Sequence, residues 1–73
     1  MARLPVVTAV SVLRAMHRAG FEKVGQRGSH VKLRNGELRV IVPFHKGKTL
    51  PPKTLKAIIQ DAGLSIEQFT DLL

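Results

Sequence analysis

Two of the three histidines stand next to small or basic residues, and they are the strongest candidates for chemistry. His30 directly follows Gly28-Ser29, where small residues permit the close approach of a ligand. Beside phosphate-binding cations, an imidazole can take a proton from a ribose 2′-hydroxyl or give one to a leaving oxygen, without a metal. A lone surface histidine is more often only a solvated residue, so both interpretations of His30 stand at this point.

His45 is the second candidate, because it follows Pro43-Phe44 in an expected loop and is followed by Lys46 and Lys48. These lysines and the N-terminus of the next helix could hold a phosphate through charge and free amides. A flexible, solvated loop is an equally good interpretation. His17 lies on the polar face of an expected helix, and we assign it to the surface.

Composition narrows the class of protein. The 73 residues carry 12 Lys plus Arg against 5 Asp plus Glu, a net charge of +7, which favours a polyanionic partner: a nucleic acid or an acidic protein surface. Cysteine is absent and the five carboxylates are scattered, so we expect no disulfide, metal or cofactor. Apolar runs are far shorter than the roughly 20 residues that cross a bilayer, so we expect a cytoplasmic protein without a membrane segment and one domain over residues 1–73.

Apolar periodicity predicts two main helices and a short third helix. The first covers residues 8–19, with Thr8 as N-cap and Gly20 as stop signal, and the second follows Pro51-Pro52 and ends at Gly63. Residues 65–68 resemble the capping box of the last helix. The apolar stripes comprise Val12, Leu13, Met16 and Ala19, then Leu55, Ile58, Ile59 and Ala62, and finally Ile66, Phe69 and Leu72.

Residues 21–43 change to a period of two, which predicts three antiparallel strands. Gly28 lies in the first turn, and Asn35-Gly36 favours a two-residue type I′ hairpin at the second. The resulting register pairs Arg34 with Glu37, Leu33 with Leu38, Lys32 with Arg39 and His30 with Ile41. One face then carries Val31, Leu33, Leu38, Val40 and Val42, and the other carries His30, Lys32, Arg34, Glu37, Arg39 and Ile41.

The order helix, three strands, helix and short helix predicts an α+β fold in two layers, with the helices on the apolar face of the sheet. The other face stays open to solvent. Like charges at Lys32 and Arg39 then oppose each other, which indicates either a phosphate-binding surface or two side chains that splay into water. Arg34 and Glu37 are expected to form an ordinary exposed ion pair.

Five short motifs give the chain a resemblance to a known family over nearly its whole length. The order and spacing of these motifs resemble those of HicA toxins. The motifs are Gly20-Phe21, Arg27-Gly28-Ser29-His30, Val42-Pro43-Phe44-His45, Leu50-Pro51 and Asp61-Ala62-Gly63-Leu64-Ser65.

The resemblance implies a double-stranded-RNA-binding-domain-like α-β-β-β-α fold and an mRNA endonuclease that arrests translation and is neutralised by a cognate HicB-like antitoxin. His30 matches the essential histidine of the family, Gly28 and Ser29 complete its motif, and His45 matches another recurrent position. Ser29 and His45 are therefore candidates for catalytic support. Electrostatics rather than resemblance, together with the open backbone at Gly28, gives the expected RNA-binding set: Gly28, Lys32, Arg34, Arg39, Lys46 and Lys48.

Two positions depart from the family pattern. Ile41 stands on the open face where relatives often carry a smaller or polar residue, so it either contacts the antitoxin or is a single exposed side chain without a role. Ser11 replaces a more usual acidic residue, which weakens the capping box of the first helix.

Three functions follow as alternatives. The first is a metal-independent endoribonuclease in which His30 is the general acid or base, with His45 or a nearby lysine as the second group. The second is an RNA-binding module without chemistry, and the third is a domain whose basic face meets an acidic protein.

Overall fold

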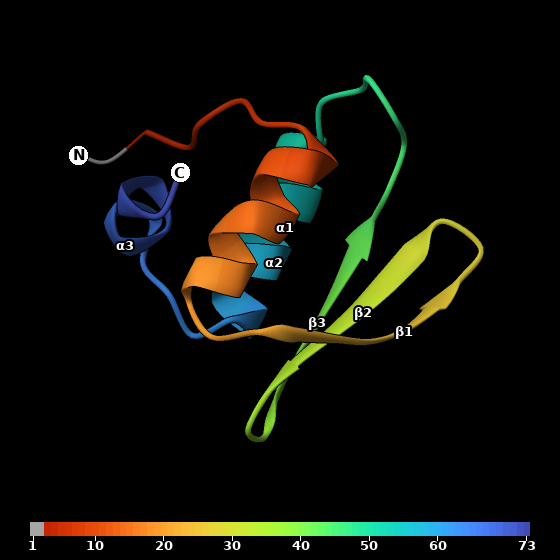
Figure 1. The fold of residues 1–73 in the computed structure, drawn as a ribbon. Helices are drawn as coiled ribbons and strands as arrows, with labels where there is room; N and C mark the ends of the chain where they lie inside the picture. The colour runs from red at the N-terminus through yellow and green to blue at the C-terminus, as the bar shows by residue number, and fades with distance from the viewer. Residues whose placement is uncertain (1–2) are drawn as a thin grey trace.

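The computed structural model describes residues 3–73. Along the chain lie α1 (Ala9–Arg18), β1 (Glu22–Arg27), β2 (His30–Asn35), β3 (Leu38–Pro43), α2 (Pro52–Asp61) and α3 (Ile66–Asp71) (Figure 1). The strands form one antiparallel sheet in the order β1-β2-β3. This is the predicted α-β-β-β-α arrangement with a short last helix, and the α+β fold class is confirmed.

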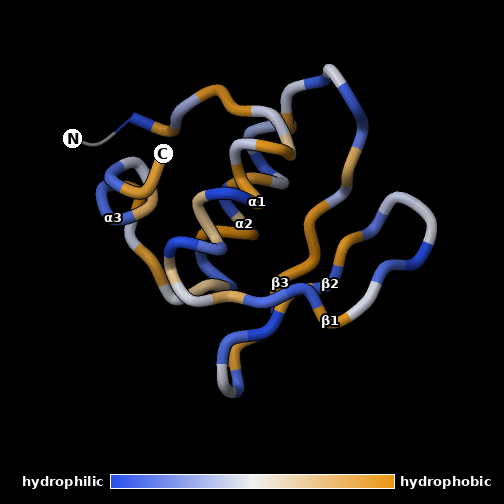
Figure 2. Tube along the Cα trace, in the orientation of Figure 1, coloured by the Kyte–Doolittle hydropathy of each residue, from blue (hydrophilic) through white to orange (hydrophobic). Residues whose placement is uncertain are grey.

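The core lies on one face of the sheet. Val31 and Leu33 of β2 and Val40 and Val42 of β3 are buried in the same cluster as the apolar stripes of α1 and α2 and as Phe69 of α3. Apolar and polar residues alternate along these strands, and the loop after β3 is mostly hydrophilic (Figure 2). The helices therefore cover one face of the sheet, and we call the opposite, solvent-facing side the outer face.

The helices begin and end at the predicted capping residues. Thr8 Oγ1 accepts a hydrogen bond from the Ser11 amide at 3.3 Å, so the N-cap of α1 works without an acidic residue. Gly20, at φ 100°, follows α1, and the Phe21 amide donates to the Met16 carbonyl at 2.9 Å. The Gly20 amide also donates to the His17 carbonyl at 3.0 Å. These two bonds form a Schellman motif, which ends a helix where a residue without a Cβ adopts positive φ.

The last two helices follow the same rules. After α2, the amide of Leu64 donates to the Ile59 carbonyl at 3.1 Å, and Gly63 has φ 71°. Both bonds of the predicted capping box of α3 are present between Ser65 and Gln68. The predictions for both helices are confirmed.

The predicted register of the second hairpin is wrong by two residues on β3. Asn35 pairs with Leu38, so the two turn residues are Gly36 and Glu37. A type I′ turn needs positive φ at both central residues, yet within residues 3–73 only glycines have positive φ, among them Gly36 at 61°. The side-chain amide of Asn35 donates to the Ala19 carbonyl at 3.3 Å, which holds Asn35 in the strand instead of the turn.

The shift by two residues preserves the faces but changes every cross-strand pair. The observed pairs are His30 with Pro43, Val31 with Val42, Lys32 with Ile41, Leu33 with Val40, Arg34 with Arg39 and Asn35 with Leu38. Because side chains alternate with period two, the buried and outer faces stay as predicted. Leu38, expected in the core, is 40% exposed because it lies at the tip of the hairpin.

The edge strand β1 is loosely covered. None of its residues is buried, and its pairing with β2 shifts between Lys23 and Gly25, which leaves Val24 as the extra residue of a bulge with 54% of its surface exposed. The apolar face of β2 beneath α1 is therefore bordered by a strand that adds no core residue.

Candidate functional site

His30 is the first residue of β2 and is exposed on the outer face. The two-residue turn Gly28-Ser29 precedes it, and Gly28 has φ 58° with no atom within 4 Å of the place where a Cβ would stand. Arg27, the last residue of β1, is the register partner of His30. Directly paired residues of an antiparallel sheet project from the same face, so a guanidinium and an imidazole emerge together beside an open glycine.

His45 lies at the same end of the sheet. His30 pairs with Pro43, and Pro43 lines one hollow together with His45. The amide of Phe44 donates to the Ser29 carbonyl at 2.6 Å, which ties the end of β3 to the turn before His30. The structure thus brings the two predicted histidines to the same end of the sheet.

Two contacts fix the loop that carries His45. The Lys48 amide donates to the His45 carbonyl at 3.1 Å and closes a turn in which Gly47 has φ 77°. Farther along, the Leu50 amide donates to the Val7 carbonyl at 2.9 Å, beside an isolated bridge between Thr8 and Thr49. Lys46 and Lys48 are exposed on this braced loop.

Four cations line the outer face. Lys32 lies two residues from His30 on the same strand, about 7 Å along it, and Arg34 lies four residues away, about 13 Å. All of them are exposed: Arg27, Lys32, Arg34 and Arg39. Arg27 was missed by the sequence predictions. The two-residue turn Gly28-Ser29 was the signal that could have found it, because that turn alone puts residue 27 opposite residue 30.

Arg39 has a structural partner. Its guanidinium donates to the Gly36 carbonyl at 2.9 Å and to the Leu38 carbonyl at 3.3 Å, both at the hairpin tip. In the observed register, the like-charge pair on the outer face is Arg34 with Arg39 and not Lys32 with Arg39. The hydrogen bonds of Arg39 to the hairpin tip offset the repulsion between these two guanidinium groups. The predicted pairing of Arg34 with Glu37 is also wrong, because Glu37 lies in the turn.

Ile41 is 51% exposed on the outer face, as predicted, but it pairs with Lys32 instead of His30. Together with Arg39 it lines a groove of about 460 Å³ whose other wall is α2, at Ala57 and Asp61. Ile41 therefore belongs to the pair that follows the His30–Pro43 pair on the outer face.

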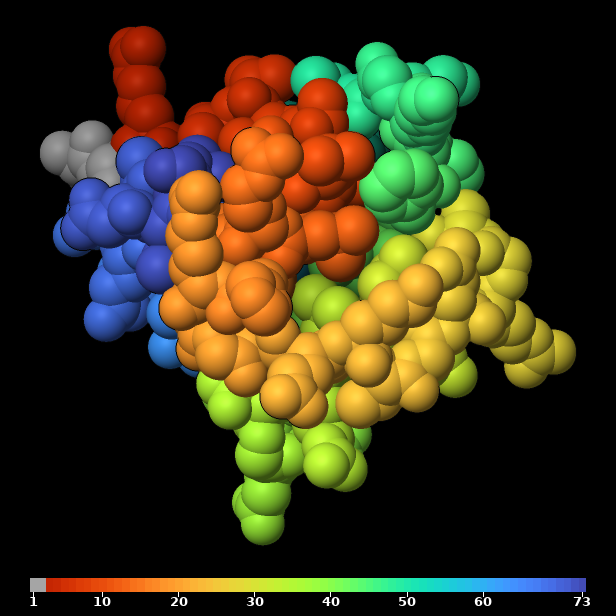
Figure 3. All heavy atoms as spheres, in the orientation of Figure 1, coloured from red at the N-terminus to blue at the C-terminus, as the bar shows by residue number. Residues whose placement is uncertain are grey.

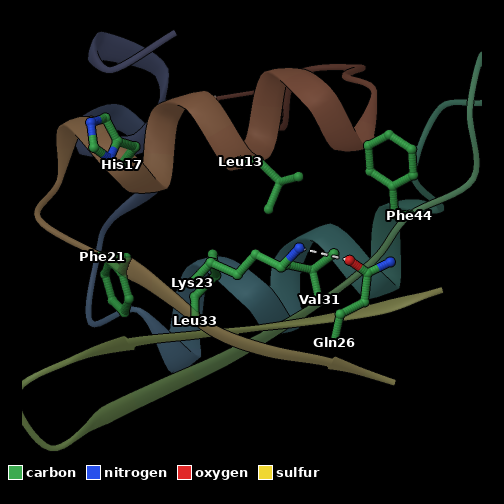
Figure 4. Close-up of a pocket in the computed structure, with 8 residues that line it drawn as sticks. All are labelled: Leu13, His17, Phe21, Lys23, Gln26, Val31, Leu33 and Phe44. Atoms are coloured by element: carbon green, nitrogen blue, oxygen red, sulfur yellow. Dashed lines mark hydrogen bonds between the residues drawn. The ribbon is translucent and has the colours of Figure 1, made fainter. Parts of the chain in front are cut away.

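A second hollow lies on the helix side of the sheet, between α1 and β1, and we call it the α1–β1 hollow. Its volume is about 320 Å³, and its walls are Leu13, Phe21, Val31, Leu33 and Phe44. Its rim carries His17, Lys23 and Gln26 (Figure 4). In Figure 3 the molecule is hollowed between α1 and β1, with residues of β2 visible on the floor.

Residues 3–73 contain neither a metal-binding cluster of side chains nor a membrane-spanning helix. In this part of the chain no three side chains among His, Cys, Asp and Glu come close enough to hold a metal ion. None of its helices has the length and hydropathy needed to cross a membrane.

The fold and the outer face define a small basic α+β protein that presents an exposed histidine among cations. A family model described as "HicA toxin of bacterial toxin-antitoxin" matches residues 11–64, which include both candidate histidines. The chain belongs to this family and is the toxin of a toxin–antitoxin pair, so a cognate antitoxin is implied. The search of curated proteins gave no match.

Proposed function

We propose that this HicA toxin is an endoribonuclease that cleaves mRNA in the cytoplasm without a metal and so inhibits translation, with residues 1–73 acting as one toxin domain. The observation that carries the proposal is the pairing of exposed His30 with Arg27 beside the open Gly28 turn. An imidazole for proton transfer and a guanidinium for a phosphate then stand on one accessible face.

The reaction that fits these groups is attack of a ribose 2′-hydroxyl on the adjacent phosphate. A base removes the 2′-hydroxyl proton as the new oxygen–phosphorus bond forms, and an acid protonates the 5′-oxygen as its bond to phosphorus breaks. The products are a 2′,3′-cyclic phosphate and a 5′-hydroxyl. Negative charge grows on the phosphate oxygens in the transition state, where Arg27 and Lys32 can stabilise it.

The reaction needs a second proton-transfer group besides His30. His45 is our first candidate, because it follows Pro43, the register partner of His30, on a loop held by backbone hydrogen bonds. Lys46, next in the chain, is the second candidate. Ser29 is half-buried, and its carbonyl accepts the Phe44 amide, so its backbone supports the turn. Its hydroxyl, next to His30 in the chain, is a further candidate for catalytic support.

Phosphate binding is assigned to the cations nearest to the histidines. Lys32 and Arg34 continue the row of positive charge along β2, and Lys46 and Lys48 add charge on the His45 loop. The backbone at Gly28 leaves room for close approach of the RNA. Arg39 is bonded to the hairpin tip, so we expect it to contribute least to RNA binding.

The test is cleavage of a defined single-stranded RNA by the parent protein and by His30→Ala, with EDTA present and the product ends analysed. We expect the parent to release 2′,3′-cyclic phosphate ends and His30→Ala to be inactive, while Gln60→Ala, an exposed change on α2, keeps parental activity. Bound antitoxin must be removed and folding checked first. Parental rates from His30→Ala would refute the mechanism.

The second group has its own test. Loss of activity in His45→Gln, with RNA affinity retained, assigns His45 to proton transfer, whereas parental activity assigns the role elsewhere.

The row of cations on the outer face also suits a protein that binds RNA without cleaving it. In that case RNA binding would weaken steeply with salt, no cleavage would be seen, and His30→Ala would bind like the parent. The same experiment therefore separates the two functions.

A further inference from the structure

The α1–β1 hollow is an apolar recess that the proposed chemistry does not use. It encloses about 320 Å³ beneath α1, with Leu13 above and Val31 and Leu33 below (Figure 4). The recess borders β1, which bulges at Val24 and adds no buried side chain at this edge of the sheet. Small-molecule sites have about this volume and are apolar with a few polar groups.

The rim of the hollow is polar and can carry positive charge. Lys23 Nζ donates to Gln26 Oε1 at 2.8 Å across the mouth, as the dashed line in Figure 4 shows. Gln26 Nε2 in turn donates to the Gly28 carbonyl at 3.0 Å. One ammonium and one amide at the mouth of an apolar recess provide donors and an acceptor for the edge of a planar heterocycle.

The hollow adjoins the turn that carries His30. Gln26 pairs with Val31, and the next pair along the same ladder is Arg27 with His30. One wall of the hollow, Phe44, donates its backbone amide to the Ser29 carbonyl at 2.6 Å. A single-stranded RNA that follows the edge of the sheet around this turn would place one nucleotide at the hollow and a neighbouring phosphate at the outer face.

We propose that the α1–β1 hollow binds one nucleobase of the single-stranded RNA that is cleaved on the outer face. The inference rests on the proposed function, because it takes RNA as the ligand. A nucleotide joins a planar base to an anion, and the site joins apolar and aromatic walls to the cation Lys23 at its rim. The cation Arg27 follows Gln26 in the chain and lies on the outer face beside His30. This charge complementarity favours a nucleotide over an uncharged apolar segment of a protein.

The experiment compares two strands of equal length and charge. One is a 2′-O-methyl RNA octamer, which lacks the free 2′-hydroxyl needed for cleavage, and the other is its abasic counterpart. Methyl NMR spectra of the parent protein report on Leu13, Val31 and Leu33. We expect the octamer to shift these three methyl signals and the abasic strand to leave them unchanged.

A variant measures the energetic effect. Leu13→Phe adds bulk to the hollow, and Leu38→Phe makes the same change at the exposed hairpin tip. We expect Leu13→Phe to weaken octamer binding about tenfold, as loss of a base–aromatic contact does. Binding of the abasic strand by Leu13→Phe, and of both strands by Leu38→Phe, should remain parental.

Several results would overturn the nucleobase site. They are methyl shifts with both strands or with neither, shifts caused only by the cognate antitoxin, and equal loss of affinity for both strands in Leu13→Phe. The methyl spectra need no variant, so they decide the question even if Leu13→Phe does not fold. A protein that cleaves RNA but gives such a result keeps the ribonuclease function and loses the base site, whereas shifts without any cleavage keep the site and refute the ribonuclease.

Discussion

Arg27 and His30 form the last pair of the β1–β2 ladder, and the phosphate is expected to lie between their side chains. Replacing Arg27 by Gln removes the charge but keeps hydrogen-bonding capacity. We expect single-turnover cleavage to fall on the order of 10²-fold, as for loss of a donor to transition-state charge. Arg14→Gln, an exposed change on α1, is the matched control, and equal rates for the two variants would contradict the role of Arg27.

Lys32 tests the phosphate-binding row separately from catalysis. A cation that neutralises one phosphate of a single strand releases counterions, so Lys32→Gln should reduce the slope of log K against log salt by about 0.7. Lys56→Gln makes the same change on an exposed position of α2 and should leave the slope unchanged. Titrations of a labelled RNA at several salt concentrations measure both, and parallel slopes would remove Lys32 from the interface.

At the scale of single residues, sequence reasoning found the histidines but only part of their surroundings. His30, Ser29 and Gly28 are adjacent in the chain, so their spacing alone suggests a site. Arg27 becomes a partner only through the register of β1 with β2. The bonds of Arg39 to the hairpin tip depend on a turn that the sequence misplaced, so its structural role could not be predicted.

The hairpin between β2 and β3 sets which residues face one another on the outer face. Gly36 holds φ 61° there, a conformation that costs a residue with a Cβ about 1–2 kcal/mol. Gly36→Ala should therefore lower the free energy of unfolding by about that amount. Gly25→Ala is the control, because Gly25 lacks positive φ and has no atom within 4 Å of the position that a Cβ would take. Urea denaturation measures both, and equal stabilities would contradict the turn geometry.

The elements show why some predictions hold and one fails. Helix limits depend on caps and stripes close in sequence, such as Thr8 and Gly20 for α1, so local rules suffice. The Asn-Gly rule is local too, but the Asn35 side chain bonds to Ala19, 16 residues earlier, and that contact keeps Asn35 in the strand. Neither this tertiary contact nor the bulge of β1 beside the hollow can be predicted from a short segment of the sequence.

The whole molecule depends on a residue outside the segment that matches the family. Phe69 of α3 is 0% exposed, although the match ends at residue 64. Removing a buried phenyl ring costs about 3–5 kcal/mol, and small domains have only about 5–15 kcal/mol in total. We expect Phe69→Ala to lose cooperative thermal unfolding or to unfold at a much lower temperature.

The control for this prediction is Glu67→Ala, which changes an exposed residue of the same helix. A melting temperature of Phe69→Ala close to that of Glu67→Ala would mean that α3 does not support the core. Any loss of RNA cleavage in Phe69→Ala follows from unfolding, so circular dichroism must accompany the activity assay.

The bond between Val7 and Leu50 and the bridge between Thr8 and Thr49 lead us to expect that the segments of His30 and His45 form at different times during folding. The turn before His30 closes between neighbours in sequence, whereas the loop of His45 is braced by a segment about forty residues earlier and must wait for that long loop to close. Local opening of the native protein follows the reverse order, so the Leu50 amide should exchange with solvent before the amides of the central strand. We therefore expect the His45 side of the site to assemble late and to open early.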